Sequence, residues 1–373
     1  MRRNRACSLD ETGVHDVATD MKIALVIGST GVAGRALVEH LTSLPEWEVL
    51  GVARKPVNPG NRAKFISVDL SDPAAARRAL AEAQNVTHVF YSAYVHAPTW
   101  AEQCGPNTTL LVNAVDALES VASGLRHICL LQGTKYYGSH LGPFRTPARE
   151  SDPRHLPPNF YYNQQDFLEE RQRGKAWTWS CARPHTICGF SLGTPLNLIV
   201  VLGVYATISK ELGLPLRWPG KPGAFRAIYQ VTDANLLARA MAWMATNPDC
   251  ANEAFNITNG DYLRFENLWP VLGHHFGIEV GPPQQIDLVQ FMSDKEPLWN
   301  HIVEKHGLVQ TEYRTMVDWG YANYAFSCDW DIMSSTLKSR RRGFGDCEDS
   351  HEMFIRHLGV LAERRIIPRP PAS

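Results

Sequence analysis

Metal-binding and disulfide patterns are missing from this 373-residue chain. Its eight cysteines are scattered and include no C-x-x-C pair, which excludes a zinc ribbon and a small disulfide scaffold. Several, such as Cys129 and Cys181, fall in apolar runs typical of buried free thiols. The 14 histidines show no H-x-x-x-H spacing, and the adjacent pair His274 and His275 would face different directions on a helix. We therefore expect no metal site.

The chain also lacks a charge excess and a long apolar run. Lys and Arg number 37 against 38 Asp and Glu, a net charge of -1, so the sequence argues against nucleic-acid binding. The most continuous apolar stretch, residues 198–205, is far shorter than the ~20 residues of a membrane helix. Residues 1–20 are polar, include acidic residues and lack the apolar core of a signal peptide. We expect a flexible tail at 1–20 and a cytoplasmic protein without a membrane partner.

What the chain does contain is an alternation of short apolar runs with amphipathic helical segments. The predicted strands are MKIALVIG, WEVLGVAR, KFISVDLSD, THVFYSAY, RHICLLQG and WTWSCARP. Helical patterns lie between most of them, and another is predicted to begin near Phe160 and run to about Arg173. Strands that alternate with helices in this way predict an α/β fold, a doubly wound parallel sheet of the Rossmann type.

A glycine-rich loop follows the first predicted strand and opens a helix. Its spacing is G-x-x-G-x-x-G, with Gly28 for the tight turn, Gly31 for close approach of the backbone to a pyrophosphate, and Gly34 for helix–strand packing. The helix N-terminus offers N–H donors to an anion. We predict that Thr30 and Val32 in this loop also contact a dinucleotide cofactor.

The end of the second strand indicates which dinucleotide binds. An NAD enzyme places an acidic residue here, but this chain has Arg54 and Lys55, and a guanidinium suits the 2′-phosphate of NADP. Asp69 at the end of the third strand could accept from the adenine amino group or could cap the next helix. Leu70 and Ser92 are further predicted cofactor contacts. The sequence thus favours NADPH.

The usual dehydrogenase dyad, Tyr-x-x-x-Lys, is absent. Four residues after Tyr161 comes Gln165, and four after Tyr162 comes Asp166, a carboxylate that would oppose phenolate formation. A cation is available in Lys135, just after the fifth strand, at the edge where doubly wound sheets bind ligands. Lys135 beside Tyr161 would form a pair of donors for negative charge on a substrate oxygen.

The segments GSTGVAG, GVARK, LLQGTKYYG, NFYYNQQD, WSCARPHTICGFS and NEAFNITNGD resemble the progesterone 5β-reductase / iridoid synthase family of atypical extended short-chain dehydrogenases. The resemblance implies a Rossmann domain with a smaller C-terminal substrate domain, and NADPH-dependent 1,4-reduction of enones and enals. By matching motifs, Lys135 takes the place of the family's catalytic lysine and Tyr161 that of its catalytic tyrosine, with Tyr162 as the fallback. Arg183 and Ile187 are expected to line the nicotinamide end.

These considerations define the predicted organisation. Residues 21–190 form the NADP-binding core, and 191–373 are mainly a substrate-binding lobe with some segments returning to the core. The predicted substrate is a small α,β-unsaturated carbonyl compound. A steroid is in doubt, because the region around 319–322 lacks the paired tryptophans and the phenylalanine that line the family's pocket. A homodimer is left open as the assembly state.

Three alternatives are left open by the sequence. The first is carbonyl reduction or epimerisation by an extended short-chain dehydrogenase, against which the missing Tyr-x-x-x-Lys argues. The second is a non-catalytic NADP sensor, against which Lys135 and Tyr161 argue. The third is a cyclase or isomerase that uses the pocket after reduction.

Overall fold

Seven parallel strands form the central sheet. The computed structural model describes residues 21–56, 60–194 and 196–371, so the predicted tail at 1–20 lies outside the described residues. The strands of the sheet are β1 (Lys22–Ile27), β2 (Trp47–Ala53), β3 (Lys64–Ser67), β4 (His88–Tyr91), β5 (His127–Leu131), β6 (Thr178–Pro184) and β9 (Glu253–Ile257). Their order is β3-β2-β1-β4-β5-β6-β9. The first six are those that the sequence predicted, and the α/β Rossmann prediction is confirmed.

The strand order reverses at β1, which lies between β2 and β4. At such a switch point the loops after neighbouring strands diverge and leave a crevice beyond their carboxyl ends. Ile27 at the end of β1 pairs with Tyr91 at the end of β4, so the loops after both strands start at the same level. The glycine-rich loop thus lies at this switch point.

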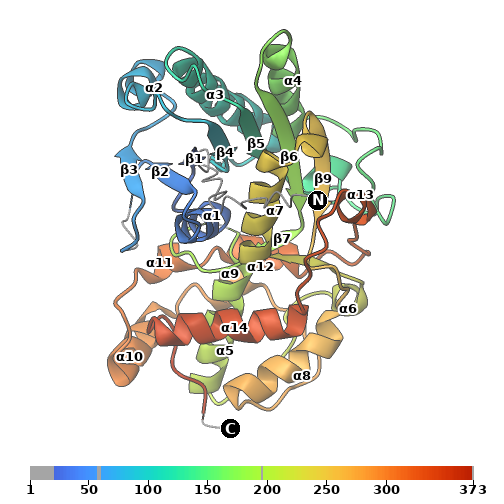
Figure 1. The fold of residues 1–373 in the computed structure, drawn as a ribbon. Coiled ribbons are helices and arrows are strands. Elements are labelled where there is room, and N and C mark those ends of the chain that lie inside the picture. Colours follow the sequence, from blue (N-terminus) through green and yellow to red (C-terminus); the bar gives the residue numbers. More distant parts are fainter. Residues whose placement is uncertain (1–20, 57–59, 195, 372–373) are drawn as a thin grey trace, which may run out of the picture.

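Helices cover both faces of the sheet (Figure 1). One face carries α1 (Val32–Ser43) and α7 (Ala234–Thr246), which share an apolar core with β1 and β2. The other carries α2 (Pro73–Leu80), α3 (Trp100–Glu119) and α4 (Phe160–Gln172). Apolar side chains of α1, α2, α3 and α7 are buried against the sheet, whereas α4 also buries Gln164 and Gln165.

The C-terminal region is mainly helical and lies at one end of the sheet, except for α13, which lies beside β9 (Figure 1). Its helices are α5 (Leu198–Glu211), α6 (Pro222–Arg226), α8 (Phe265–Phe276), α9 (Leu288–Phe291), α10 (Glu296–His306), α11 (Tyr313–Met316), α12 (Trp319–Ala325), α13 (Leu337–Arg341) and α14 (Ser350–Glu363). The apolar run at 198–205 is the first part of α5, which is buried from Leu198 to Ser209. Among the described residues no helix has the length and apolar character to cross a bilayer.

Two segments beyond residue 190 belong to the sheet domain, namely α7 and β9. A small two-stranded sheet, β7 (Thr186–Cys188) with β8 (Val231–Asp233), leads into α7. Buried Asp233 caps α7 and accepts a hydrogen bond from His357 of α14 at 2.7 Å, which ties the C-terminal region to the sheet domain. Two 3-10 turns, η1 (Thr134–Tyr137) and η2 (Pro248–Cys250), complete the described elements. The assignment of the C-terminal region to substrate binding stays a prediction.

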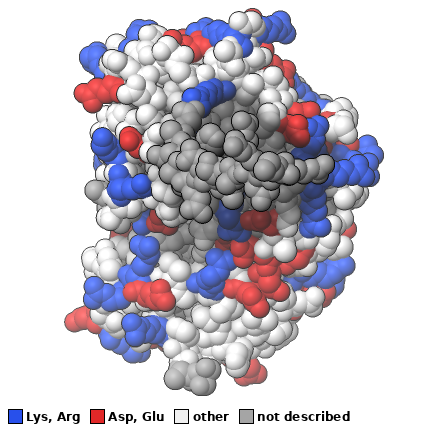
Figure 2. All heavy atoms as spheres, viewed as in Figure 1, with Lys and Arg blue, Asp and Glu red and all other residues white. Residues whose placement is uncertain are grey.

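Acidic and basic side chains alternate over the described surface that Figure 2 shows, in keeping with the net charge of -1.

Candidate cofactor and active site

The glycine-rich loop has room only for glycine at two positions. Gly28 has φ +85°, and a Cβ there would lie 2.8 Å from the backbone of Ser92 and Ala93. A Cβ at Gly34 would lie 2.2 Å from the Gly28 carbonyl oxygen, so this glycine allows α1 to pack on the loop. Gly31 is the N-cap of α1 and has no side chain to cap it, which leaves the first N–H groups of the helix available to an anion.

The other predicted loop residues surround this turn. The Ser92 hydroxyl donates to the Ile27 carbonyl at 2.8 Å and fixes the end of β4 against β1. The Thr30 carbonyl accepts from Ser191 at 2.9 Å, which links the loop to the segment after β7. Val32 and Ile187 pack against the core shared by α1 and α7. Together these contacts hold the glycine turn in place.

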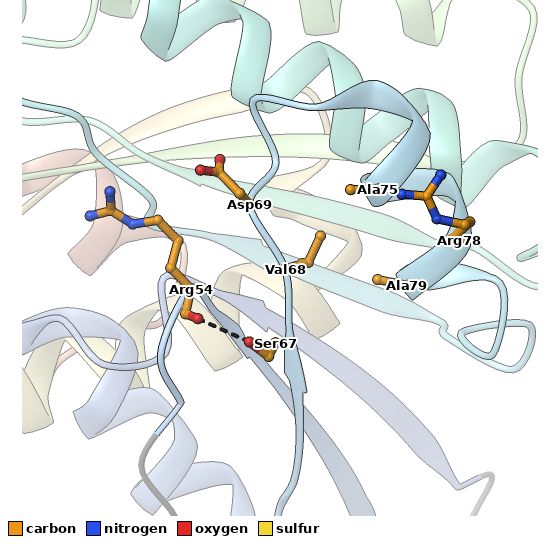
Figure 3. A pocket seen from close by; sticks show the side chains of 7 residues that line it. All are labelled: Arg54, Ser67, Val68, Asp69, Ala75, Arg78 and Ala79. Carbon is orange, nitrogen blue, oxygen red and sulfur yellow. Dashed lines mark hydrogen bonds between the residues drawn. The ribbon is translucent and has the colours of Figure 1, made fainter.

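A basic pocket opens beyond β2 and β3 (Figure 3). It has a volume of about 550 Å³ and is lined by Arg54, Ser67, Val68, Asp69, Ala75, Arg78 and Ala79. The Ser67 hydroxyl donates to the Arg54 carbonyl at 2.9 Å and holds the ends of the two strands together. Arg54 enters from the end of β2 and Arg78 from α2 (Figure 3). Lys55 is exposed beside the pocket and is not among its lining residues.

Arg78 is a cation that the sequence analysis missed. Arg78 lies in the last turn of α2, the helix that follows β3, and no cofactor contact was predicted for it. Asp72, not Asp69, caps this helix by accepting from two backbone N–H groups. Asp69 accepts from the Ser71 N–H at 2.9 Å, which lowers the pKa of its carboxyl group. Leu70 is 5% exposed in the apolar core, so only its backbone can contact a cofactor.

The side chain of Asn159 links the segments that carry Lys135 and Tyr161. Lys135 lies in η1, just after β5, and its carbonyl accepts from the Asn159 amide at 2.8 Å. Asn159 is also the N-cap of α4 and accepts from the Tyr161 N–H at 3.0 Å. The Gln132 amide donates to the Tyr161 carbonyl at 3.1 Å. The turn after β5 and the start of α4 thus form one unit.

The two adjacent tyrosines have different surroundings. The Tyr162 hydroxyl donates to the Tyr136 carbonyl at 2.6 Å and accepts from the His155 N–H at 2.8 Å, so it is committed to the fold. No hydrogen bond within the described part of the chain engages the Tyr161 hydroxyl. That hydroxyl lies against the backbone of Gly133, where an added Cβ would come within 3.3 Å of it. Burial raises the pKa of Tyr161, so the phenol keeps its proton.

The Lys135 ammonium lies among aromatic rings. Its Nζ is 4.4 Å from the ring centre of Trp100 in α3 and 5.6 Å from that of Tyr324 in α12. Burial lowers the pKa of Lys135 to about 8, and nearby Cys328 partly offsets this effect. None of the ion pairs between described residues involves Lys135. Asp166, which stands four residues after Tyr162, forms an ion pair with Arg154 at 2.5 Å and not with Lys135.

Arg183 differs from its predicted role. It is 1% exposed, and its three guanidinium nitrogens donate to Gln132, Tyr137 and Gln165 at 2.9–3.0 Å. Its guanidinium also stacks on the Tyr136 ring at 3.4 Å. Because every nitrogen is engaged inside the protein, Arg183 can reach a cofactor only through its backbone. Gln165, where a dehydrogenase would have lysine, belongs to this buried network.

Within the described residues, no group of three or more His, Cys, Asp or Glu side chains is placed to hold a metal ion. A glycine turn with a basic pocket lies on one side of the switch point. On the other side Lys135 follows β5 and Tyr161 lies in α4, and Asn159 joins the two segments.

The chain was compared with known proteins. The model of the PRISE-like Rossmann-fold domain matches residues 69–331. An (S)-8-oxocitronellyl enol synthase of Nepeta cataria is 35% identical over 98% of this chain and 96% of its own length. A 3-oxo-Delta(4,5)-steroid 5-beta-reductase of Arabidopsis thaliana is 35% identical over 93% of each chain.

Solved structures with the same fold include UDP-glucose 4-epimerase of Thermotoga maritima, with a TM-score of 0.65 and 14% identity over 91% of this chain and 99% of that one. A short-chain dehydrogenase/reductase superfamily protein of Agrobacterium tumefaciens with bound NAD gives a TM-score of 0.63 at 14% identity, over 92% and 98% of the two chains. Similarity at this identity concerns the fold alone.

Proposed function

Because the chain belongs to the family of PRISE-like Rossmann-fold proteins, we propose that it is an NADPH-dependent reductase of enones or enals. The observation that carries the proposal is the Tyr161 hydroxyl, which no hydrogen bond between described residues engages, on the unit that also holds Lys135. The 5-beta-reductase relative, by its name, reduces the C=C bond of a 3-oxo-Δ(4,5) steroid, which is an enone.

The residues around the glycine turn fit a dinucleotide. A side chain at Gly28 or Gly34 would fill the cradle, and the first N–H groups of α1 suit a pyrophosphate. Arg54 lines the pocket beyond β2, where its guanidinium would pair with a 2′-phosphate, and Arg78 adds a second positive charge to the same pocket; this favours NADPH over NADH. When bound, the cofactor supplies hydride to the β-carbon of the substrate.

Lys135 and Tyr161 then stabilise the charge that develops on the substrate oxygen. Addition at the β-carbon turns the carbonyl oxygen into an enolate, and two preorganised donors favour that state over the neutral substrate. The raised pKa of Tyr161 keeps it a donor that does not give up its proton. The α-carbon can take its proton from solvent, so the site needs no second acid.

The residue four positions after Tyr161 distinguishes this proposal from carbonyl reduction. A ketone reductase must transfer a proton from its tyrosine to the oxygen, and a lysine one helical turn away lowers the tyrosine pKa for that purpose. Here Gln165 occupies that position and is engaged by Arg183. The structural similarity to epimerases concerns the fold and does not restore this dyad.

The test is NADPH oxidation with a panel of small enones and enals, run beside the matching saturated ketones and beside NADH. We expect turnover of the unsaturated compounds only, a preference for NADPH, and saturated carbonyl products. With 4-deuterated NADPH the label should appear at the β-carbon. Allylic alcohols as products would support carbonyl reduction, and no NADPH oxidation with any compound would support a sensor.

A further inference from the structure

The Lys135 ammonium faces two aromatic rings that come from distant parts of the chain. Trp100 is the first residue of α3, in the sheet domain, and its ring centre lies 4.4 Å from Nζ. Tyr324 lies in α12 of the C-terminal region, 5.6 Å from Nζ. Both distances are within the ~6 Å over which a ring face attracts a cation. We propose that Trp100 and Tyr324 form an aromatic clamp that keeps Lys135 charged and in position.

The clamp would compensate the Lys135 ammonium for the hydration that it loses on burial. An ammonium removed from water loses hydration, and this burial favours the neutral amine. Carboxylates are the usual compensation, but none pairs with Lys135 among the described residues. A carboxylate here would also compete with a substrate oxygen for the ammonium. Aromatic faces supply attraction without a negative charge, so they leave the N–H donors available to an enolate.

Trp100 is itself fixed in place. Thr99 and Glu102 form a capping box at the start of α3, which sets where the helix begins and hence where Trp100 lies. His140 packs against the indole in a T-shaped arrangement, with ring centres 4.5 Å apart. Burial and Lys135 together lower the pKa of His140 to about 4, so His140 is neutral and does not repel the ammonium at neutral pH.

The remaining titratable neighbours of Lys135 also bear on its charge. Tyr324, Tyr161 and Cys328 all have pKa values raised by burial, so they stay protonated and uncharged near pH 8. The attraction that the two rings offer Lys135 therefore does not depend on the charge of these groups. The two rings are positioning residues, and their effect on turnover rests on the proposed role of Lys135 in the reductase.

A direct measurement of the Lys135 pKa tests the clamp without relying on activity. The full-length protein is acetylated with acetic anhydride over a pH series, and mass spectrometry quantifies the peptide that carries Lys135. We expect a midpoint near 8 for the natural protein. Trp100→Leu should lower it by roughly 0.5 to 1 pH unit, and Tyr324→Leu by less because its ring is farther away.

Matched variants keep the test independent of folding. Trp100→Phe and Tyr324→Phe retain a ring, so their midpoints should stay close to that of the natural protein. Trp100 and Tyr324 are both partly exposed, so the leucine variants should fold, which thermal melting checks. An unchanged midpoint in both leucine variants would overturn the clamp. A raised midpoint would also overturn it, since the rings would then act by excluding water.

The two proposals fail in different ways. If the midpoint shifts as expected but no enone is reduced, the clamp stands and the reductase fails. If enones are reduced and the acetylation midpoint is unchanged in both leucine variants, the reductase stands and the clamp fails.

Discussion

Two cations follow two parallel strands of the same sheet, but one is exposed to solvent and the other is half-buried. Arg54, after β2, is exposed and lines an open pocket with a second arginine. Lys135, after β5, is half-buried under aromatic rings without a carboxylate partner among the described residues. The first site suits a permanent charge on a phosphate. The site around Lys135 suits the negative charge that a substrate oxygen would carry only during the reaction. Each prediction below changes one of the two sites.

The largest effect should come from removing the buried cation. We expect Lys135→Met to lower kcat/KM for enones by about 10²- to 10³-fold, because one preorganised donor to the enolate is lost. Steady-state NADPH oxidation measures this. The control is Lys64→Met, which removes an exposed lysine at the start of β3 and should leave kcat/KM within about twofold. Equal losses in the two variants would show that Lys135 has no special role.

The site around Lys135 contains a second donor, and the adjacent tyrosine offers a matched control. Tyr161→Phe should lower kcat by roughly 100-fold without altering stability, since no described group bonds to its hydroxyl. Tyr162→Phe should keep most of kcat but lose about 1–3 kcal/mol of unfolding free energy, because the Tyr136 carbonyl and the His155 N–H lose their partner. Kinetics and denaturant unfolding distinguish the two, and the reversed pattern would make Tyr162 the active residue.

Substitutions in the exposed Arg54 pocket should change the affinity for the cofactor and leave the rate of the chemical step unchanged. Arg54→Gln should raise the KM for NADPH by about 10- to 100-fold and leave kcat with saturating cofactor unchanged, because a charged contact to the phosphate is lost. NADH, which lacks that phosphate, should be used as before. Arg78→Gln should act in the same direction with a smaller effect. A fall in kcat with either cofactor would argue that this pocket is not the phosphate site.

Much of the fold and part of the site could be predicted from the sequence, because both depend on local patterns. Strands β1 to β6 follow from apolar runs, and the G-x-x-G-x-x-G turn from glycine spacing. β9 was not predicted as a strand, since it reaches the sheet only through pairing with β6. Arg183 was expected near the cofactor, but its guanidinium is turned into a buried network that no local pattern reveals. Tyr324 reaches Lys135 only through the tertiary fold.

The pH dependence should separate the two cations next. The pKa of Lys135 is lowered to about 8, so its ammonium is present below that pH and is lost as the pH rises through it. We expect kcat/KM for the enone to be constant between about pH 6 and 7 and to fall about tenfold per unit well above 8. A guanidinium stays charged over this range, so cofactor affinity should not follow the same curve. Activity that is flat to pH 10 would show that the charged form is not required.

Salt should give the smallest difference. At 1 M ionic strength the screening length is about 3 Å, compared with about 10 Å at 0.1 M, and screening acts mainly on exposed charges. Raising NaCl from 0.05 to 0.5 M should therefore increase the KM for NADPH roughly two- to fourfold through the exposed Arg54 site. The same change should leave kcat nearly constant, because Lys135 is enclosed by Trp100 and Tyr324. If Trp100→Leu opens the site around Lys135 to solvent, kcat in that variant should become sensitive to salt. The Lys135 and Arg54 sites would then both respond to ionic strength.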